Sequence, residues 1–138
     1  MRNITALALG LLFIGLGLYA AAAVTPFAYS AAFDLDGATR NVVALFVMLT
    51  ITAITSAFGG WITARLVSDH RVGHALMAAT LGLVAAVLMG AVRWGAAPSW
   101  YWVTSWLVIP AAAAVGAAAW ERTLRRNGRD VARRVAAT

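Results

Sequence analysis

Four long runs of apolar residues, separated by short polar segments, dominate the pattern along the chain. They cover about Ile4–Val24, Asn41–Thr63, His74–Val92 and Ser99–Trp120, and no Asp, Glu, Lys or Arg lies inside them. As helices rising about 1.5 Å per residue, each is long enough for about 30 Å of hydrocarbon. Backbone groups in lipid must bond internally, and the alternating pattern of a barrel is absent. The runs are therefore predicted to be transmembrane helices.

The composition agrees with this prediction. Hydrophobic residues make up 62% of the 138 residues and charged residues 12%, against about half and about a quarter in a soluble domain. We predict an all-α integral membrane protein, with a four-transmembrane-helix bundle over 1–120 and a basic tail over 121–138. The chain has no cysteine, which excludes disulfides and thiolate sites.

The positions of the arginines predict the orientation. With four spans, the N-terminus, the 64–73 loop and the tail share one side, and nine of the eleven arginines lie there. The other side has only Arg40 and Arg93. Because positive residues stay in the cytoplasm, both termini are predicted to be cytoplasmic.

The first run raises one alternative. Met1–Arg2, the apolar run and the small residues of Tyr19–Ala23 resemble a signal peptide with a cleavage site. The run of about 21 residues is longer than the roughly 7–15 of a signal core, so we expect an uncleaved helix. Cleavage would leave three spans and the same cytoplasmic tail.

Tryptophan and tyrosine gather at the predicted ends of the spans. Such rings prefer the headgroup level, so they are predicted to form interfacial belts. The alternative is that the outer cluster stacks on a ligand. The outer set is Trp94, Trp100, Tyr101, Trp102 and Trp106, and the inner set is Trp61 and Trp120.

Two stripes of small residues run along the second and third spans at intervals of four. Small residues let helix backbones approach closely in lipid, and hydroxyl groups can bond between helices. We predict that the stripes are packing interfaces; the alternative is that their hydroxyls line a polar path. The helix-packing residues are Thr52, Ser56, Gly60 and Ala64 in the second span and Ala78, Gly82, Ala86 and Gly90 in the third.

His70 and His74 are one helical turn apart, with Asp69 adjacent. Two histidines at this spacing can share a metal, but a site needs a third and usually a fourth ligand, and the chain has no other histidine. We predict no metal site, and we expect Ser68 or Asp69 to cap the following helix.

The tail concentrates positive charge directly after the last span. Its arginines are predicted to bind the headgroups of anionic lipids; no nucleic-acid recognition fold accompanies them, so no nucleic acid is expected. Asn127–Gly128 is expected to interrupt any helix there. The lipid-headgroup residues are Arg122, Arg125, Arg126, Arg129, Arg133 and Arg134.

The interiors of the spans carry no Asp, Glu, Lys, Arg or His, and such residues usually mark proton relays and ion sites. Four-helix multidrug exporters would carry a membrane-embedded Glu, which this chain lacks. No serine lies with a base and a group to orient it. We therefore predict no catalytic residue, no cofactor and no enzyme activity.

The segment Gly59–Arg65, read Gly-Gly-Trp-Ile-Thr-Ala-Arg, is followed by His74-Ala75-Leu76 and Gly82. With Pro98–Tyr101 and a proline at 110, this pattern resembles a group of small uncharacterised bacterial four-helix membrane proteins. The resemblance covers roughly residues 40–116 and departs from the group at 116–117, where Gly-Ala stands in place of Gly-Gly. It implies the fold and a bacterial inner (plasma) membrane, and no known activity.

These observations favour an accessory or scaffolding subunit, acting with a membrane-protein partner or as a homo-oligomer. The alternative is a channel or carrier for a small neutral solute. It would use the hydroxyls of Thr52 and Ser56 and a helix kink at Pro110.

Overall fold

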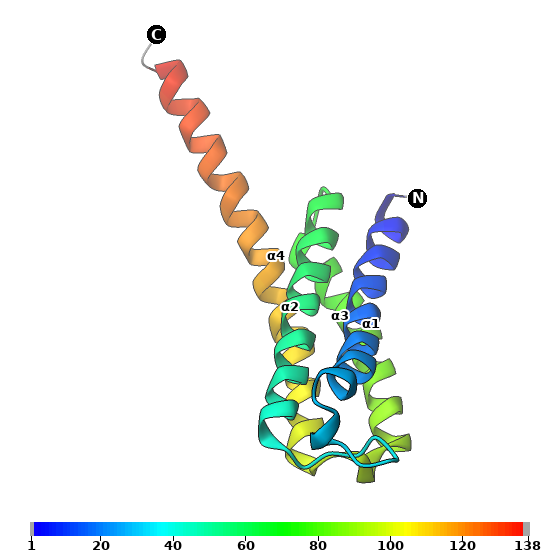
Figure 1. Cartoon of the computed structure of the whole chain (residues 1–138). Coiled ribbons are helices and arrows are strands. Elements are labelled where there is room, and N and C mark those ends of the chain that lie inside the picture. The colour runs from blue at the N-terminus through cyan, green and yellow to red at the C-terminus, as the bar shows by residue number, and fades with distance from the viewer. Residues whose placement is uncertain (1, 137–138) are drawn as a thin grey trace.

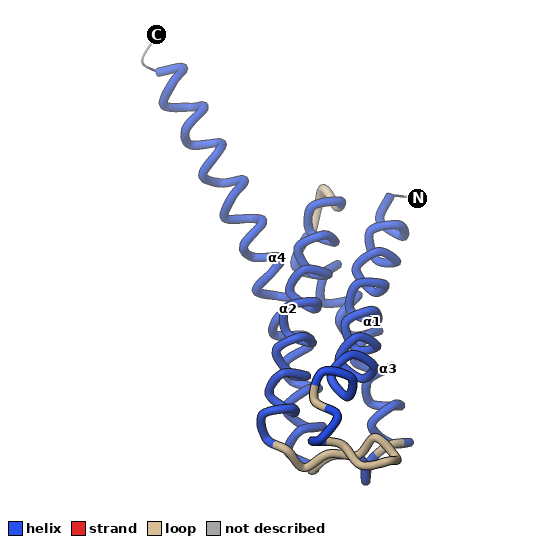
Figure 2. The backbone as a smooth tube through the Cα atoms, in the orientation of Figure 1, coloured by secondary structure: helices blue, strands red, loops and turns tan. Residues whose placement is uncertain are grey.

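The computed structural model describes residues 2–136 and consists of helices joined by short loops. The long helices are α1 (Arg2–Ala28), α2 (Val42–Leu66), α3 (Arg71–Val92) and α4 (Ser99–Ala136). Two single-turn 3₁₀ helices, η1 (Ser30–Ala32) and η2 (Trp94–Ala96), lie in the connections. Within residues 2–136 there is no strand (Figure 2). The predicted all-α four-helix bundle is confirmed.

The helices alternate in direction, so the bundle has two distinct ends (Figure 1). We call the end with the start of α1 and the α2–α3 turn the inner end. The end with the 29–41 and 93–98 connections is the outer end. The C-terminal part of α4 projects past the inner end and slants away from the other helices, on the same side as the N-terminus (Figure 1).

All four helices are long and apolar enough to cross a membrane. The qualifying segments are Asn3–Ala28, Val42–Leu66, Arg71–Val92 and Ser99–Asn127, with 26, 25, 22 and 29 residues. Much of their apolar surface is exposed in the isolated chain, as expected where lipid replaces water as the solvent. The chain is a multi-pass membrane protein.

In the bundle, α2 lies between α1 and α4 and packs against both most extensively, while α3 contacts the other three helices. The α2–α4 seam is the closest. A Cβ atom at Gly60 would meet the backbone of Ala113, with Ala113 C and Cα at 2.7 Å, and a Cβ at Gly116 would meet the backbone of Ala57, with its carbonyl carbon at 2.7 Å. Backbones approach this closely only where side chains are absent.

The α1–α2 seam is built in the same way. A Cβ at Gly59 would lie 2.8 Å from the carbonyl oxygen of Gly10. Beside this contact, the Thr63 hydroxyl donates to the Gly59 carbonyl of its own helix at 2.9 Å and contacts the Ala6 carbonyl of α1 at 3.4 Å. A threonine thus joins the two backbones at the closest contact.

The predicted boundaries need two corrections. The first helix continues to Ala28 through Pro26, four residues beyond its predicted end. The last helix continues without a break through Asn127–Gly128 to Ala136, because a glycine inside a helix costs only about 1 kcal/mol and neither residue prevents helical dihedrals. The same helix also contains Pro110, and the predicted kink at this residue stays a prediction.

The predicted cap of α3 is also wrong. The capping position belongs to His70, which has left-handed dihedrals (φ 49°, ψ 42°) and forms no side-chain cap bond. With Asp69 as its cap α3 would start at residue 70, and with Ser68 as its cap it would start at residue 69. The helix starts at Arg71 instead. The Ser68 hydroxyl donates instead to the Asp69 carboxylate at 3.2 Å.

Candidate functional site

The two predicted packing stripes are buried along their whole length, but they do not face each other. All eight residues are buried. On α2, Gly60 faces α4, whereas on α3 a Cβ at Gly82 would lie 2.6 Å from Cγ2 of Ile14 in α1. Toward the outer end, a Cβ at Gly90 would lie 3.1 Å from atoms of Trp102 and Trp106.

The remaining stripe residues occupy the core clusters and the outer end. Ala64 packs with Ala75 and Ala117 near the inner end. Ala78 lies beside Gly10. Ser56 is fully buried and its hydroxyl has no hydrogen-bond partner. Thr52 and Ala86 line a cavity at the outer end.

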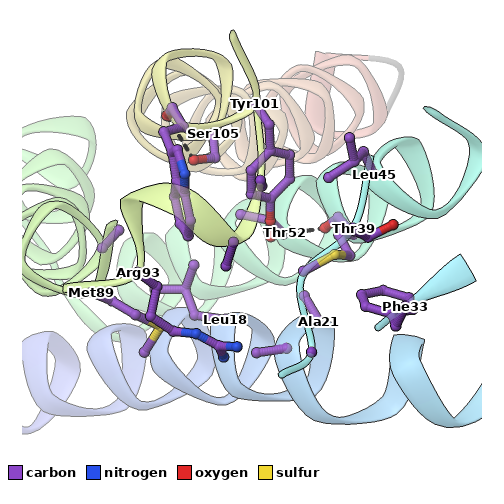
Figure 3. Close-up of a pocket in the computed structure, with 17 residues that line it drawn as sticks. Leu18, Ala21, Phe33, Thr39, Leu45, Thr52, Met89, Arg93, Tyr101 and Ser105 are labelled. Atoms are coloured by element: carbon purple, nitrogen blue, oxygen red, sulfur yellow. Dashed lines mark hydrogen bonds between the residues drawn. The ribbon is translucent and has the colours of Figure 1, made fainter. Parts of the chain in front are cut away.

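This cavity lies inside the bundle, under the two outer connections (Figure 3), and has a volume of about 60 Å³. All four long helices contribute to its lining, as do both connections. The apolar part of the lining includes Leu18, Leu45, Met48 and Met89. The sequence singled out Thr52, Ala86, Tyr101 and Trp102 among the lining residues, but it did not bring them together, because a cavity formed by six segments leaves no periodic pattern in any of them.

Four residues with hydroxyl groups line the cavity, namely Thr39, Thr52, Tyr101 and Ser105. The Thr52 hydroxyl donates to the Met48 carbonyl at 2.9 Å, and the Ser105 hydroxyl donates to the Trp102 carbonyl at 2.8 Å. Tyr101 points from α4 into the same space (Figure 3) and is 6% exposed. The mainly apolar wall therefore also carries polar side chains and the guanidinium of Arg93.

The two connections form a cover joined by hydrogen bonds. The Thr39 backbone N–H donates to the Ala96 carbonyl at 2.8 Å, which links one connection to the other. Arg93 reaches from the end of α3 toward α1 (Figure 3), and its guanidinium donates to the Asp36 carbonyl at 3.4 Å. Gly37 turns the backbone with φ +72°, and a Cβ there would lie 3.3 Å from the guanidinium.

The aromatic residues separate into two groups with different surroundings. At the inner end, the Arg65 guanidinium lies 5.4 Å from the ring centroid of Trp61 and 5.6 Å from that of Trp120, and it joins α2 to α4 through cation–π contacts. At the outer end, Trp94 and Trp100 are exposed, as an interfacial belt requires. Tyr101 differs, because it is turned into the bundle.

The arginines of the tail lie on the projecting part of α4. The side chains of Arg122, Arg125, Arg126 and Arg129 are exposed. Arg133 and Arg134 belong to the same helix, but their side chains lie outside the described residues.

The histidines contact each other through the backbone. Nδ1 of His74 lies 3.1 Å from the carbonyl oxygen of His70. Among the described residues, no three His, Asp or Glu side chains are close enough to hold a metal ion.

Together, the fold and the cavity define a multi-pass α-helical membrane protein with a small, partly open cavity at one end. Comparison of the chain with protein-family models, with curated proteins and with solved structures gives no match. The resemblance carried by Gly59–Arg65 therefore stays a prediction.

Proposed function

We propose that the chain is a non-enzymatic accessory or scaffolding subunit of the bacterial inner membrane, with both termini in the cytoplasm. The composition of the bundle interior supports this most directly. Among the described residues, the buried polar side chains outside the aromatic ones are all Thr or Ser. Such an interior supplies no acid, base or charged relay for catalysis or ion transfer. The chain can contact a partner through its outer surface and through the part of α4 that carries the tail arginines, which we call the arginine helix.

The arginine helix supports attachment to the inner leaflet. Each basic residue near an anionic surface contributes about 1 kcal/mol to membrane binding, and this contribution falls with added salt. The continuous helix makes this array an ordered extension of a membrane span. Anionic lipid is therefore the partner we propose for the tail.

Variants of the tail test the lipid proposal. Replacing the six arginines with Gln should weaken the association of the protein with anionic vesicles, and salt should weaken the wild type but not the variant. A matched control replaces Arg40 and Arg93, which lie at the outer end, with Gln. Equal binding of wild type and tail variant to anionic and neutral vesicles would refute the proposal.

The scaffolding role is tested by purification from native membranes in a mild detergent. A stoichiometric partner that stays with the wild type, and leaves when exposed Leu12 and Leu16 of α1 are changed to Ala, supports the proposal. Alanine keeps the helix and removes only surface that contacts lipid or a partner. A chain that purifies alone and transports a solute in liposomes would contradict it.

One observation favours the alternative function, a channel or carrier for a small neutral solute: Thr52 lines the outer cavity. Ser56, the second residue of that hypothesis, does not line it. Toward the inner end, Ile14, Ile109 and Ala113 form a buried cluster across the bundle axis. Transport would require these helices to separate, and solute flux into liposomes is the measurement that tests it.

A further inference from the structure

The inner end of the bundle carries an arginine that contacts two tryptophan rings. The guanidinium carbon of Arg65 lies 5.4 Å from the ring centroid of Trp61 and 5.6 Å from that of Trp120. The two rings meet edge to face, with centroids 5.6 Å apart and an interplanar angle of 84°. Contacts with ring faces use the charge and the flat surface of a guanidinium and leave the N–H groups at its edge able to donate. Because Arg65 is exposed, these donors are accessible from outside the bundle.

The close α2–α4 seam holds the two tryptophans together. The backbones of α2 and α4 are in contact at Gly60 and at Gly116. Trp61 follows the first glycine directly, and Trp120 lies one helical turn after the second. Trp120 also packs against the buried alanine cluster near the inner end. The helix backbones, and not a flexible loop, therefore position the rings that contact Arg65.

An aromatic row leads from Trp61 toward the middle of the bundle. Phe58 stacks on Trp61 with ring centroids 5.5 Å apart and an interplanar angle of 18°, and Phe13 of α1 meets Phe58 edge to face at 5.2 Å. Phe58 is 47% exposed, so the row faces the surrounding lipid. It precedes Arg65 by seven residues, which is about 10 Å along the helix axis. The surface thus has a cation at the end of a span and an apolar strip beside it, deeper in the membrane.

We propose that this surface, which we call the Arg65 site, binds one phospholipid of the leaflet at the inner end. Two phosphate oxygens accept from the N–H groups of Arg65, because the planar guanidinium matches the geometry of a phosphate. One acyl chain lies along Phe58 and Phe13. The depth agrees, since Arg65 is the last residue but one of α2 and tryptophan rings prefer the headgroup level. The neighbouring acid Glu121 lines a hollow with residues 68–73 of the α2–α3 turn.

The Arg65 site differs from the tail in what it recognises. The tail arginines are proposed to respond to the net negative charge of a lipid surface. A two-oxygen contact with Arg65 instead requires the phosphate itself, which a phospholipid without net charge also carries. Phosphatidylethanolamine is such a lipid, because its ammonium group balances its phosphate. Its binding therefore tests the Arg65 site separately from the tail and from any protein partner.

Two probes with the same acyl chains test the proposal. Dioctanoyl phosphatidylethanolamine carries the phosphate and dioctanoylglycerol lacks it. Native mass spectrometry of the full chain, released from an uncharged detergent, counts the lipids bound to each chain. We expect one phosphatidylethanolamine to bind saturably and dioctanoylglycerol to bind about tenfold more weakly, the effect of charge-assisted hydrogen bonds. Excess inorganic phosphate should not displace the phospholipid, because it has no chain to contact the aromatic row.

Variants of one residue separate shape from charge. Arg65→Gln should weaken phosphatidylethanolamine about tenfold and leave dioctanoylglycerol unchanged. Arg65→Lys keeps the positive charge but not the planar pair of donors, so it should also bind the phospholipid more weakly than the wild type does. The matched control is Arg71→Gln, which removes the same charge from the same end of the bundle. Arg71 donates from Nε to the Val67 carbonyl at 3.0 Å, and its replacement should leave phospholipid binding unchanged.

The results that overturn the proposal are distinct from a folding defect. The melting temperature of each variant identifies loss of structure, and the wild-type comparison of the two probes needs no variant. Equal wild-type affinities for the two probes would overturn the proposal, as would equal binding of phosphatidylethanolamine to wild type and Arg65→Gln. Displacement by inorganic phosphate would assign the site to a free anion instead. A dimer without bound lipid would assign the aromatic row to a second copy of the chain, which also contradicts the proposal.

Discussion

A methyl group added to the α2–α4 seam should destabilise the bundle although alanine is the better helix former. In Gly60→Ala the new Cβ would lie 2.7 Å from the carbonyl carbon and Cα of Ala113 and still closer to its oxygen. Ordinary contact between carbon atoms needs about 3.5–4.0 Å, so the two helices must separate by about 1 Å. Backbone atoms cannot rotate aside as a side chain would.

The expected magnitude combines two opposing effects. Overpacking a close-packed site costs about 1–3 kcal/mol, and Gly→Ala inside a helix recovers up to about 1 kcal/mol through helix propensity. We expect a net loss of about 1–2 kcal/mol for Gly60→Ala. Gly116→Ala, whose Cβ would meet the backbone of Ala57 on the same seam, should behave alike.

Gly15 provides the matched control. It is a helical glycine of α1, it is exposed, and a Cβ there would meet nothing within 4 Å. Gly15→Ala should therefore gain only the higher helix propensity of alanine, and the protein should be equally or more stable. The assay is thermal unfolding in detergent, with circular dichroism and tryptophan fluorescence as two probes. If Gly60→Ala proves as stable as Gly15→Ala, the seam does not depend on backbone contact.

Three other measurements address separate features. Gly82→Ala should lower the free energy of unfolding by less than Gly60→Ala does, because its new Cβ would meet the side chain of Ile14 rather than a backbone. Thermal unfolding of the two variants in detergent measures this difference. Asn41→Ala should destabilise the protein by about 1 kcal/mol, since the Asn41 side chain accepts from Val43 N and Ala44 N at the start of α2; Asn41→Asp, which keeps an acceptor, should not. A reporter fused after residue 138 should be cytoplasmic and one within residues 34–37 external, and the reverse result would refute the arginine-based orientation.

The sequence predicted the spans and the small residues that pack, but not the pairing of helices. Composition alone identifies segments that lipid will accept, so the four spans were correct to within a few residues. Spacing by four places Gly60 and Gly82 on definite faces of their helices. The spacing does not show which helix lies against each face. Gly60 faces α4, and Gly82 faces α1.

Two local interpretations went wrong for identifiable physical reasons. Asn127–Gly128 was interpreted as a break, although both residues have only moderately low helix propensity and the helix is already formed when it reaches them. Tyr101 was assigned to an interfacial belt with its tryptophan neighbours. Its register on α4 instead turns it into the bundle, and nothing in the local sequence distinguishes the two orientations.

The cavity and the close seams have a common origin in the distribution of side-chain size along the bundle. From the inner end to the middle, glycine and alanine let α1, α2 and α4 approach until their backbones touch. Toward the outer end larger side chains, including Leu45, Met48 and Trp102, hold the helices apart. The cavity lies among these larger side chains, and the two hydrogen-bonded connections cover it. The seam that stabilises the bundle therefore also positions Tyr101, Thr52 and Ser105 around a single cavity.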